Sequence, residues 1–105
     1  MSQTAAQIET AIAGADKPVI LEFHGAQCRP CITQEDLLMH ASVHPSFPAK
    51  VVSISVDDQP SYAERYGVKS VPSVVLIQDG KTKAHFSGLV DAGSVISAIE
   101  TQQAR

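Results

Sequence analysis

The sequence contains no tryptophan and only two cysteines among its 105 residues. It has no apolar run near the ~18 residues that a membrane span needs, so we expect no membrane partner. It also lacks an excess of basic charge: its formal net charge is −3, and lysine and arginine are scattered along the chain. This charge gives no electrostatic reason to expect nucleic acid as a partner.

The chain length is typical of one compact domain, so we expect a single domain over residues 1–105. The first residues, Met-Ser-Gln-Thr-Ala-Ala-Gln, show no basic segment followed by an apolar one. A secretory signal is therefore not expected, and a cytoplasmic location is predicted. We expect the protein to be a monomer or a weak dimer.

The two cysteines, Cys28 and Cys31, are three residues apart. A disulfide framework in a small secreted domain uses more cysteines, set further apart. Two cysteines alone also leave a zinc site short of ligands. His24 is the histidine nearest to them and could tune Cys28 or join a metal site with both. The other histidines are expected to be solvated or hydrogen-bonded: His40, His44 and His85. We predict no metal ion.

The hydrophobic pattern predicts an α/β fold with the element order α-β-α-β-α-β-β-α. Helices are expected at about residues 2–14, 29–42, 60–66 and from 91, and strands at 19–23, 51–56, 71–77 and 82–86. Strands joined by a long helical crossover should be parallel, and the last hairpin, which turns at Asp79-Gly80, antiparallel. This order predicts a mixed sheet of about four strands with helices on both faces. In the second helix, the inner face is expected to hold Leu37, Leu38 and Ala41.

The strand expected at residues 19–23 is mostly apolar, as in strands buried on both faces of a sheet. Glu22 lies within it. Burial disfavours a charged carboxylate, so we expect the pKa of Glu22 to be raised. The alternative is that its side chain reaches an edge of the sheet or pairs with a lysine.

Cys28 stands where the second helix is expected to begin, and Pro30 fits the first turn of a helix. The free N–H groups and the dipole of a helix N-terminus favour a thiolate there. Cys31 points back toward the same turn, so the pair can form a disulfide. Cys28 is predicted to attack a substrate disulfide, and Cys31 to displace the reduced product. The alternative is an inert pair or a static surface disulfide.

Three segments resemble the thioredoxin family. Cys28-Arg29-Pro30-Cys31 after an apolar strand is similar to Cys-Gly-Pro-Cys, and residues 66–73, Tyr-Gly-Val-Lys-Ser-Val-Pro-Ser, are similar to Tyr-Gly-Val-x-x-x-Pro-Thr. The turn at residues 79–80, followed by Gly88, matches the family's last hairpin. The resemblance covers roughly residues 18–103. It implies the thioredoxin fold and a protein-disulfide oxidoreductase with a redox-active disulfide, no other cofactor, protein disulfides as substrates and a reductase as electron donor.

The resemblance also implies roles for single residues. Pro72 matches a cis proline that packs against the active-site cysteines, and Val71 would offer its backbone to an extended substrate segment. Gly88 would permit close approach of that segment from the other side. Glu22 matches a buried acid that assists proton transfer at Cys31.

Arg29 replaces the family's glycine and places a cation next to Cys28. We predict that it stabilises the Cys28 thiolate and makes the protein more oxidising than the about −270 mV of thioredoxin. The alternative is that Arg29 points into solvent and adapts the surface to a partner.

Other positions near the motif also depart from the common family. Gln27 replaces the tryptophan before the first cysteine, and His24 replaces another aromatic residue, so we expect a different choice of partner. Ser53 stands where the family has a lysine that pairs with the buried acid. Glu35 lies four residues after Cys31, as in a branch of the family that acts in dedicated reductive relays.

Two other functions compete with that of a disulfide reductase. One is an adaptor that docks a partner through the groove at Val71-Pro72 without turnover. The other is a more oxidising disulfide oxidase or isomerase. The intact cysteine pair favours an oxidoreductase over the adaptor, because an adaptor needs neither cysteine.

Overall fold

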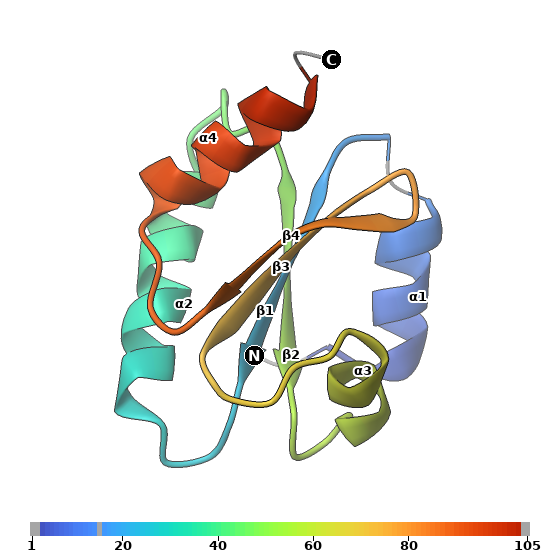
Figure 1. Cartoon of the computed structure of the whole chain (residues 1–105), viewed down its shortest axis with the longest axis vertical. Helices are drawn as coiled ribbons and strands as arrows, with labels where there is room; N and C mark the ends of the chain where they lie inside the picture. Colours follow the sequence, from blue (N-terminus) through green and yellow to red (C-terminus); the bar gives the residue numbers. More distant parts are fainter. Residues whose placement is uncertain (1–2, 15, 104–105) are drawn as a thin grey trace.

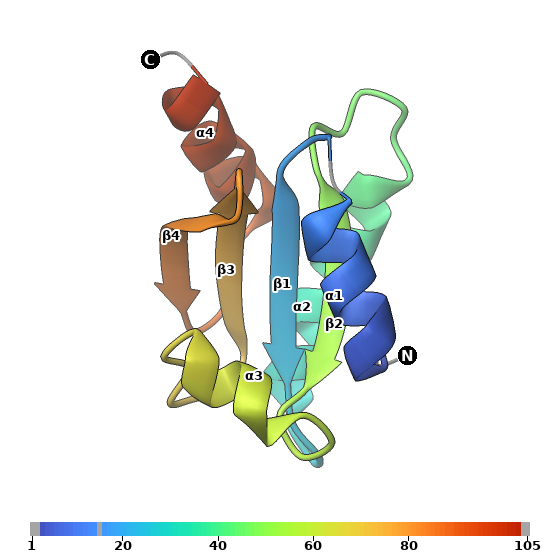
Figure 2. The ribbon, with the colours of Figure 1, turned by 90° about the vertical axis from the view of Figure 1, so that its right-hand side faces the viewer.

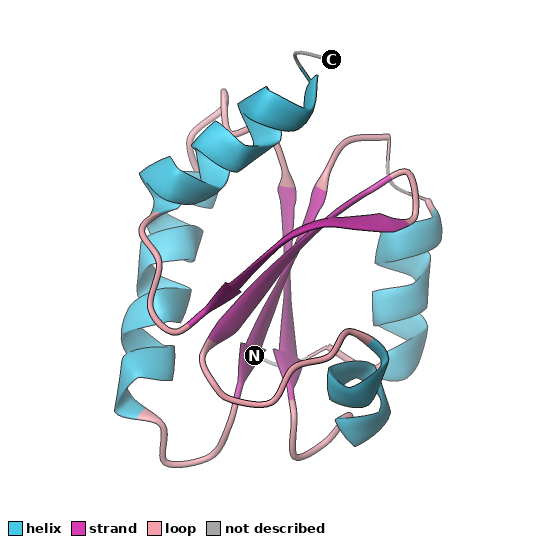
Figure 3. Ribbon diagram, viewed as in Figure 1, coloured by secondary structure: helices cyan, strands magenta, loops and turns pink. Residues whose placement is uncertain are grey.

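The fold is described by a computed structural model that covers residues 3–14 and 16–103. A four-stranded sheet lies between two layers of helices (Figure 1, Figure 3). The element order confirms the predicted α-β-α-β-α-β-β-α. The elements are α1 (Ala5–Ala13), β1 (Val19–His24), α2 (Arg29–Ser42), β2 (Lys50–Ser55), α3 (Pro60–Arg65), β3 (Ser73–Gln78), β4 (Lys81–Ser87) and α4 (Ala92–Gln103).

The strand order across the sheet is β2-β1-β3-β4. β1 and β2, which α2 connects, are parallel as predicted, and the β3–β4 hairpin is antiparallel. The connection through α3 does not follow the crossover rule, because β3 runs antiparallel to β1. Figure 2 shows the reason: α3 lies at the end of the sheet where β2 finishes, so the chain enters β3 from that same end.

The two faces of the sheet hold separate parts of the core, as the alternation along a strand requires. On one face, Leu21 and Phe23 pack with Ile8 of α1 and Tyr62 of α3. On the other face, Ile20 of β1 packs with side chains of α2 and α4. That second cluster includes Ile20, Leu38, Val74, Leu76, Val95 and Ile99. Glu22, His24 and Ser53 alternate onto this second face, the one that α2 covers.

Two expectations about element positions are wrong. Leu37 is 38% exposed and does not belong to the inner face of α2, whereas Leu38 is fully buried. The reason is that Leu37 lies about 100° of helix rotation away from Leu38. β3 begins at Ser73, so Val71 and Pro72 precede the strand. Proline has no N–H to donate to a strand ladder.

β2 forms one edge of the sheet. The described residues contain no strand before α1, and the backbone N–H of Gln3 donates a single hydrogen bond to the Ser53 carbonyl, at 2.9 Å. None of the helices in the described part of the chain has the length and apolar character needed to cross a membrane.

Candidate active site

The cysteines lie at the N-terminus of α2, where Cys28 is the N-cap residue. Their sulfurs form a disulfide with an S–S distance of 2.02 Å, so the pair can join as predicted. The backbone N–H of Cys31 donates to Sγ of Cys28 at 3.2 Å. Pro30 falls in the first turn, where its missing N–H leaves no partner unpaired.

The two sulfurs differ in their access to solvent. Cys28 is partly exposed, whereas Cys31 is 3% exposed. An incoming disulfide can therefore reach Cys28, and Cys31 lies behind it. This asymmetry agrees with Cys28 as the attacking cysteine and Cys31 as the resolving one.

An open cavity of about 480 Å³ lies against the disulfide. Its walls come from the end of β1, the loop that follows it and the first turns of α2. The lining residues are His24, Gly25, Gln27, Cys28, Arg29, Cys31, Ile32 and Glu35. Side chains that can gain or lose a proton therefore share this cavity with both sulfurs.

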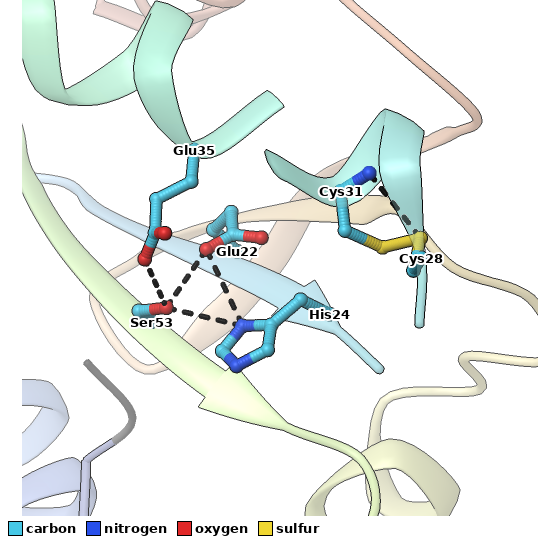
Figure 4. A network of polar contacts seen from close by, with 6 residues as sticks. All are labelled: Glu22, His24, Cys28, Cys31, Glu35 and Ser53. Atoms are coloured by element: carbon cyan, nitrogen blue, oxygen red, sulfur yellow. Dashed lines mark hydrogen bonds and ion pairs between the residues drawn. A yellow bond between two sulfur atoms is a disulfide. The ribbon is translucent and has the colours of Figure 1, made fainter. Parts of the chain in front are cut away.

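Figure 4 shows a polar network of Glu22, His24, Glu35 and Ser53, in which His24 and Glu35 also line the cavity. Glu22 on β1 stands opposite Ser53 on β2, and the Ser53 hydroxyl donates to Glu22 Oε1 at 2.8 Å. The same hydroxyl lies 3.2 Å from Glu35 Oε2 of α2 and 3.2 Å from His24 Nδ1. His24 Nδ1 is 3.6 Å from Glu22 Oε1. One serine hydroxyl thus joins two carboxyl groups and an imidazole.

Glu22 is completely buried, and burial raises its pKa as predicted. The hydrogen bond from Ser53 and the charge of His24 lower the pKa of Glu22, and the nearby Glu35 raises it. The alternative placement of Glu22 is wrong: its side chain stays inside the protein, and its partners are Ser53 and His24. Ser53 occupies the place where the resemblance implies a lysine.

Val71, Pro72 and Gly88 come together beside the cysteine loop. The Val71–Pro72 peptide is cis, as the resemblance implied. The N–H of Gly88 donates to the Pro72 carbonyl at 2.9 Å, and Gly88 has a φ of +86°, which favours glycine. A Cβ atom on Gly25 would lie 3.3 Å from Val71 Cγ2. The loop that contains Val71 therefore passes close to the loop that precedes Cys28.

Gln27 and Arg29 flank Cys28 and are both exposed on the cavity wall. Gln27 has a φ of 54°, in the left-handed region. Exposure of Arg29 agrees with both readings of its role, so its effect on the thiolate stays a prediction.

Gly25 and Ile32 of the cavity wall were not predicted as site residues, and neither were two residues that support the site, Asp57 and Gln34. Asp57 Oδ2 accepts a hydrogen bond from the Ala26 N–H at 2.9 Å and holds the loop before the cysteines. Gln34 is fully buried in α2, and its amide pairs with both the N–H and the carbonyl of Val90, at 2.8 and 2.9 Å. A signal for Gln34 was present in the sequence, because it lies one helical turn before Leu38 on the inner face.

The remaining histidines lie away from this site. His40, His44 and His85 are exposed, and His44 Nδ1 interacts with the Ser46 hydroxyl. Within the described residues, no three histidine, cysteine, aspartate or glutamate side chains gather in a way that could hold a metal ion.

Comparison with known proteins places this geometry beside one family. The family model described as Thioredoxin matches residues 1–101. Two chloroplastic thioredoxins of Arabidopsis thaliana are each 30% identical to the chain over 98 residues, which are 93% of the chain. The chain spans only 59% and 57% of their lengths. A thioredoxin of Rickettsia bellii is 29% identical over 91 residues, with 87% of each protein covered.

Solved structures give the same result. A mutant thioredoxin from Halobacterium salinarum NRC-1 superposes with a TM-score of 0.82 at 28% identity, covering 95% of this chain and 86% of that one. Chloroplastic thioredoxin z superposes with a TM-score of 0.84 at 24% identity, covering 99% and 94%, and this likeness shows the fold. The chain is therefore similar to these proteins in sequence and in backbone.

Proposed function

This chain belongs to the thioredoxin family, and on that premise we propose that it is a thiol–disulfide oxidoreductase acting on protein disulfides. One observation carries the proposal: the disulfide at the start of α2 has an accessible outer sulfur on Cys28 and a buried inner one on Cys31. The substrate class comes from the family, and the chain's own geometry supports it.

In the reducing direction, the Cys28 thiolate attacks one sulfur of a substrate disulfide. A bond forms between Cys28 and that sulfur, and the other substrate sulfur leaves with the electron pair and takes up a proton. Cys31 then loses its proton and attacks Cys28, which releases the second substrate thiolate and closes the Cys28–Cys31 disulfide. The substrate gains two electrons, and a reductase restores the dithiol.

The loop at Val71-Pro72 and the glycine at position 88 would form the substrate groove. Val71 lies close to Gly25 of the cysteine loop, so a segment bound along its backbone would pass near Cys28. Gly88 presents no side chain there and pairs its N–H with the Pro72 carbonyl. These contacts support strand addition as the binding mode.

Reduction of insulin by dithiothreitol tests the activity, with Cys28→Ser and Cys31→Ser as the variants. We expect the wild type to accelerate precipitation of the insulin B chain and both variants to fail. Cys31→Ser should also retain substrate proteins as mixed disulfides on Cys28, because the displacing sulfur is absent. Cys28→Ser is the matched control and should retain far fewer, since its remaining sulfur is buried.

A folded wild-type protein that leaves the insulin rate at background would contradict an oxidoreductase and favour the adaptor. The cytoplasmic location, the reductase and the monomeric or weakly dimeric state stay predictions.

A further inference from the structure

The buried acid of the network has no direct contact with solvent. The Glu22 side chain is 1% exposed. Its Oε1 accepts a hydrogen bond from the Ser53 hydroxyl, and its Oε2 is buried with no hydrogen-bond partner among the described residues. A carboxyl group in this position can exchange a proton with water only through a neighbouring group.

His24 bridges this carboxyl and the cavity. Its side chain is 22% exposed and lines the same cavity as both cysteines. Its Nδ1 atom lies 3.6 Å from Glu22 Oε1 and 3.2 Å from the Ser53 hydroxyl oxygen. Imidazole is the side chain that gains and loses a proton most readily near neutral pH.

We propose that His24 carries protons between the buried carboxyl group of Glu22 and the water of the active-site cavity during each redox cycle. The inference rests on the proposed oxidoreductase function and assigns it a further residue. His24 need not touch the reacting sulfurs; it acts through Glu22.

The other groups of the network are less suited to this role. Ser53 is buried, and a hydroxyl group is a poor acid and base at neutral pH. Glu35 lies 3.2 Å from the Ser53 hydroxyl and also lines the cavity, but a carboxyl group is less suited than an imidazole to exchange protons near neutral pH. Arg29, at the start of α2, lines the cavity with a fixed positive charge. Asp57, after β2, accepts a hydrogen bond from the Ala26 N–H.

The proposed step follows the attack of Cys28 on the substrate. The S–H bond of Cys31 breaks, and its proton goes to Glu22, which is the role that the resemblance implies for this acid. The Cys31 thiolate forms a bond with the Cys28 sulfur, and the bond from Cys28 to the substrate sulfur breaks, with the electron pair on the substrate. Glu22 then gives its proton to His24, and the imidazolium releases a proton to water in the cavity. In reduction of the disulfide the protons travel the opposite way.

Three variants test the proposal. His24→Asn keeps a polar side chain that cannot shuttle a proton and leaves room for a small base. His24→Phe keeps a ring of similar size and leaves no such room. His85→Asn is the matched control, because His85 is exposed on β4 and lies opposite Val75, which packs on the other face of the sheet.

The measurement is single-turnover oxidation of the reduced protein by a saturating synthetic peptide disulfide, from pH 6 to 8. We expect about a tenfold loss of rate in both His24 variants, less than the 10²–10⁴-fold that a group acting directly on the reacting atoms supplies. Free imidazole in the buffer should restore the rate of His24→Asn but not of His24→Phe. His85→Asn should keep the rate, the reduction potential and the thermal midpoint of the wild type.

Equal rates for the wild type and His24→Asn would overturn the proposal. So would a slow His24→Asn whose rate does not respond to imidazole, since that result assigns His24 a structural role. If His24→Asn does not fold, His24→Phe decides: a wild-type rate and pH profile in that variant contradict proton transfer by His24. A wild-type protein that fails to react with the peptide contradicts the proposed function itself, and is thereby told apart from a failure of this inference.

Discussion

Arg29 places a fixed charge one residue after the attacking cysteine, on the wall of the same cavity. A guanidinium group near Cys28 stabilises its thiolate, which exists in the reduced protein and not in the disulfide. We therefore expect Arg29→Gly to lower the reduction potential. Because Arg29 is exposed, solvent screens the effect, and we expect a shift of about 10–30 mV.

Equilibration with glutathione buffers measures this shift. Arg29→Lys is the matched control, since it keeps the charge and should keep the potential. The same potential in Arg29→Gly and the wild type would show that Arg29 serves the surface rather than the thiolate.

Single residues of the site differ in how far the sequence predicted them. Glu22 was predicted to be a buried acid because it interrupts an apolar strand. Its contact with Ser53 depends on the register between β1 and β2, where the two residues are directly opposite. Nothing local to either residue determines that register. The resemblance placed Ser53 beside the buried acid, whereas the contacts of Ser53 with Glu35 and His24 are known only from the structure.

At the scale of elements, Gln34 ties α2 to the chain between β4 and α4. Its buried amide forms two hydrogen bonds with the backbone of Val90, two residues after Gly88 of the proposed groove. Gln34→Leu would leave a backbone N–H and a carbonyl without these partners. We expect the free energy of unfolding to fall by about 1–3 kcal/mol.

Urea denaturation measures the loss, and amide hydrogen exchange at Val90 should become faster in Gln34→Leu. Thr33→Leu is the control: its position is exposed on the same helix, so we expect a change within about 0.5 kcal/mol. Unchanged exchange at Val90 in Gln34→Leu would mean that packing, and not the amide, holds this loop.

The bounds of elements followed from local chemistry where a clear signal existed. α2 covers Arg29–Ser42, as predicted, because Cys28 and Pro30 mark its first turn and prolines follow its end. The turn at Asp79-Gly80 was predicted because these residue types tolerate a positive φ. In the structure both residues have a positive φ. Leu37 was misplaced because a strong apolar residue next to Leu38 does not show which of the two faces the sheet.

At the scale of the whole molecule, the element order and the helix layers were predictable, whereas the pairing of β3 was not. β1 and β2 are parallel because α2 returns the chain across the full length of the sheet. α3 is a short helix of six residues that keeps the chain at one end, so β3 reverses direction and inserts beside β1. Hydrophobic periodicity predicts the helices and strands, but it does not predict that β3 pairs with β1.

The raised pKa of Glu22 makes the stability of the whole fold depend on pH. Below the ordinary glutamate value of 4.5 the carboxyl group is protonated in both the folded and the unfolded chain. As the pH rises, the unfolded chain releases this proton first, so the free energy of unfolding falls until the folded carboxyl group also ionises. The amide side chain in Glu22→Gln cannot ionise, so we expect this variant not to lose stability as the pH rises. At pH 8 it should therefore be more stable than the wild type.

Urea denaturation of the oxidised proteins from pH 4 to 8 measures this difference, because the cysteines do not titrate in the disulfide. Glu100→Gln is the matched control: Glu100 is exposed on α4, so its curve should follow the wild type. The difference in the free energy of unfolding between Glu22→Gln and the wild type should be near zero at pH 4 and grow as the pH rises. The reason is that the buried carboxyl group can ionise and the amide cannot. A constant difference across the range would instead mean that the pKa of Glu22 is the same in the folded and the unfolded chain, which would contradict a pKa raised by burial.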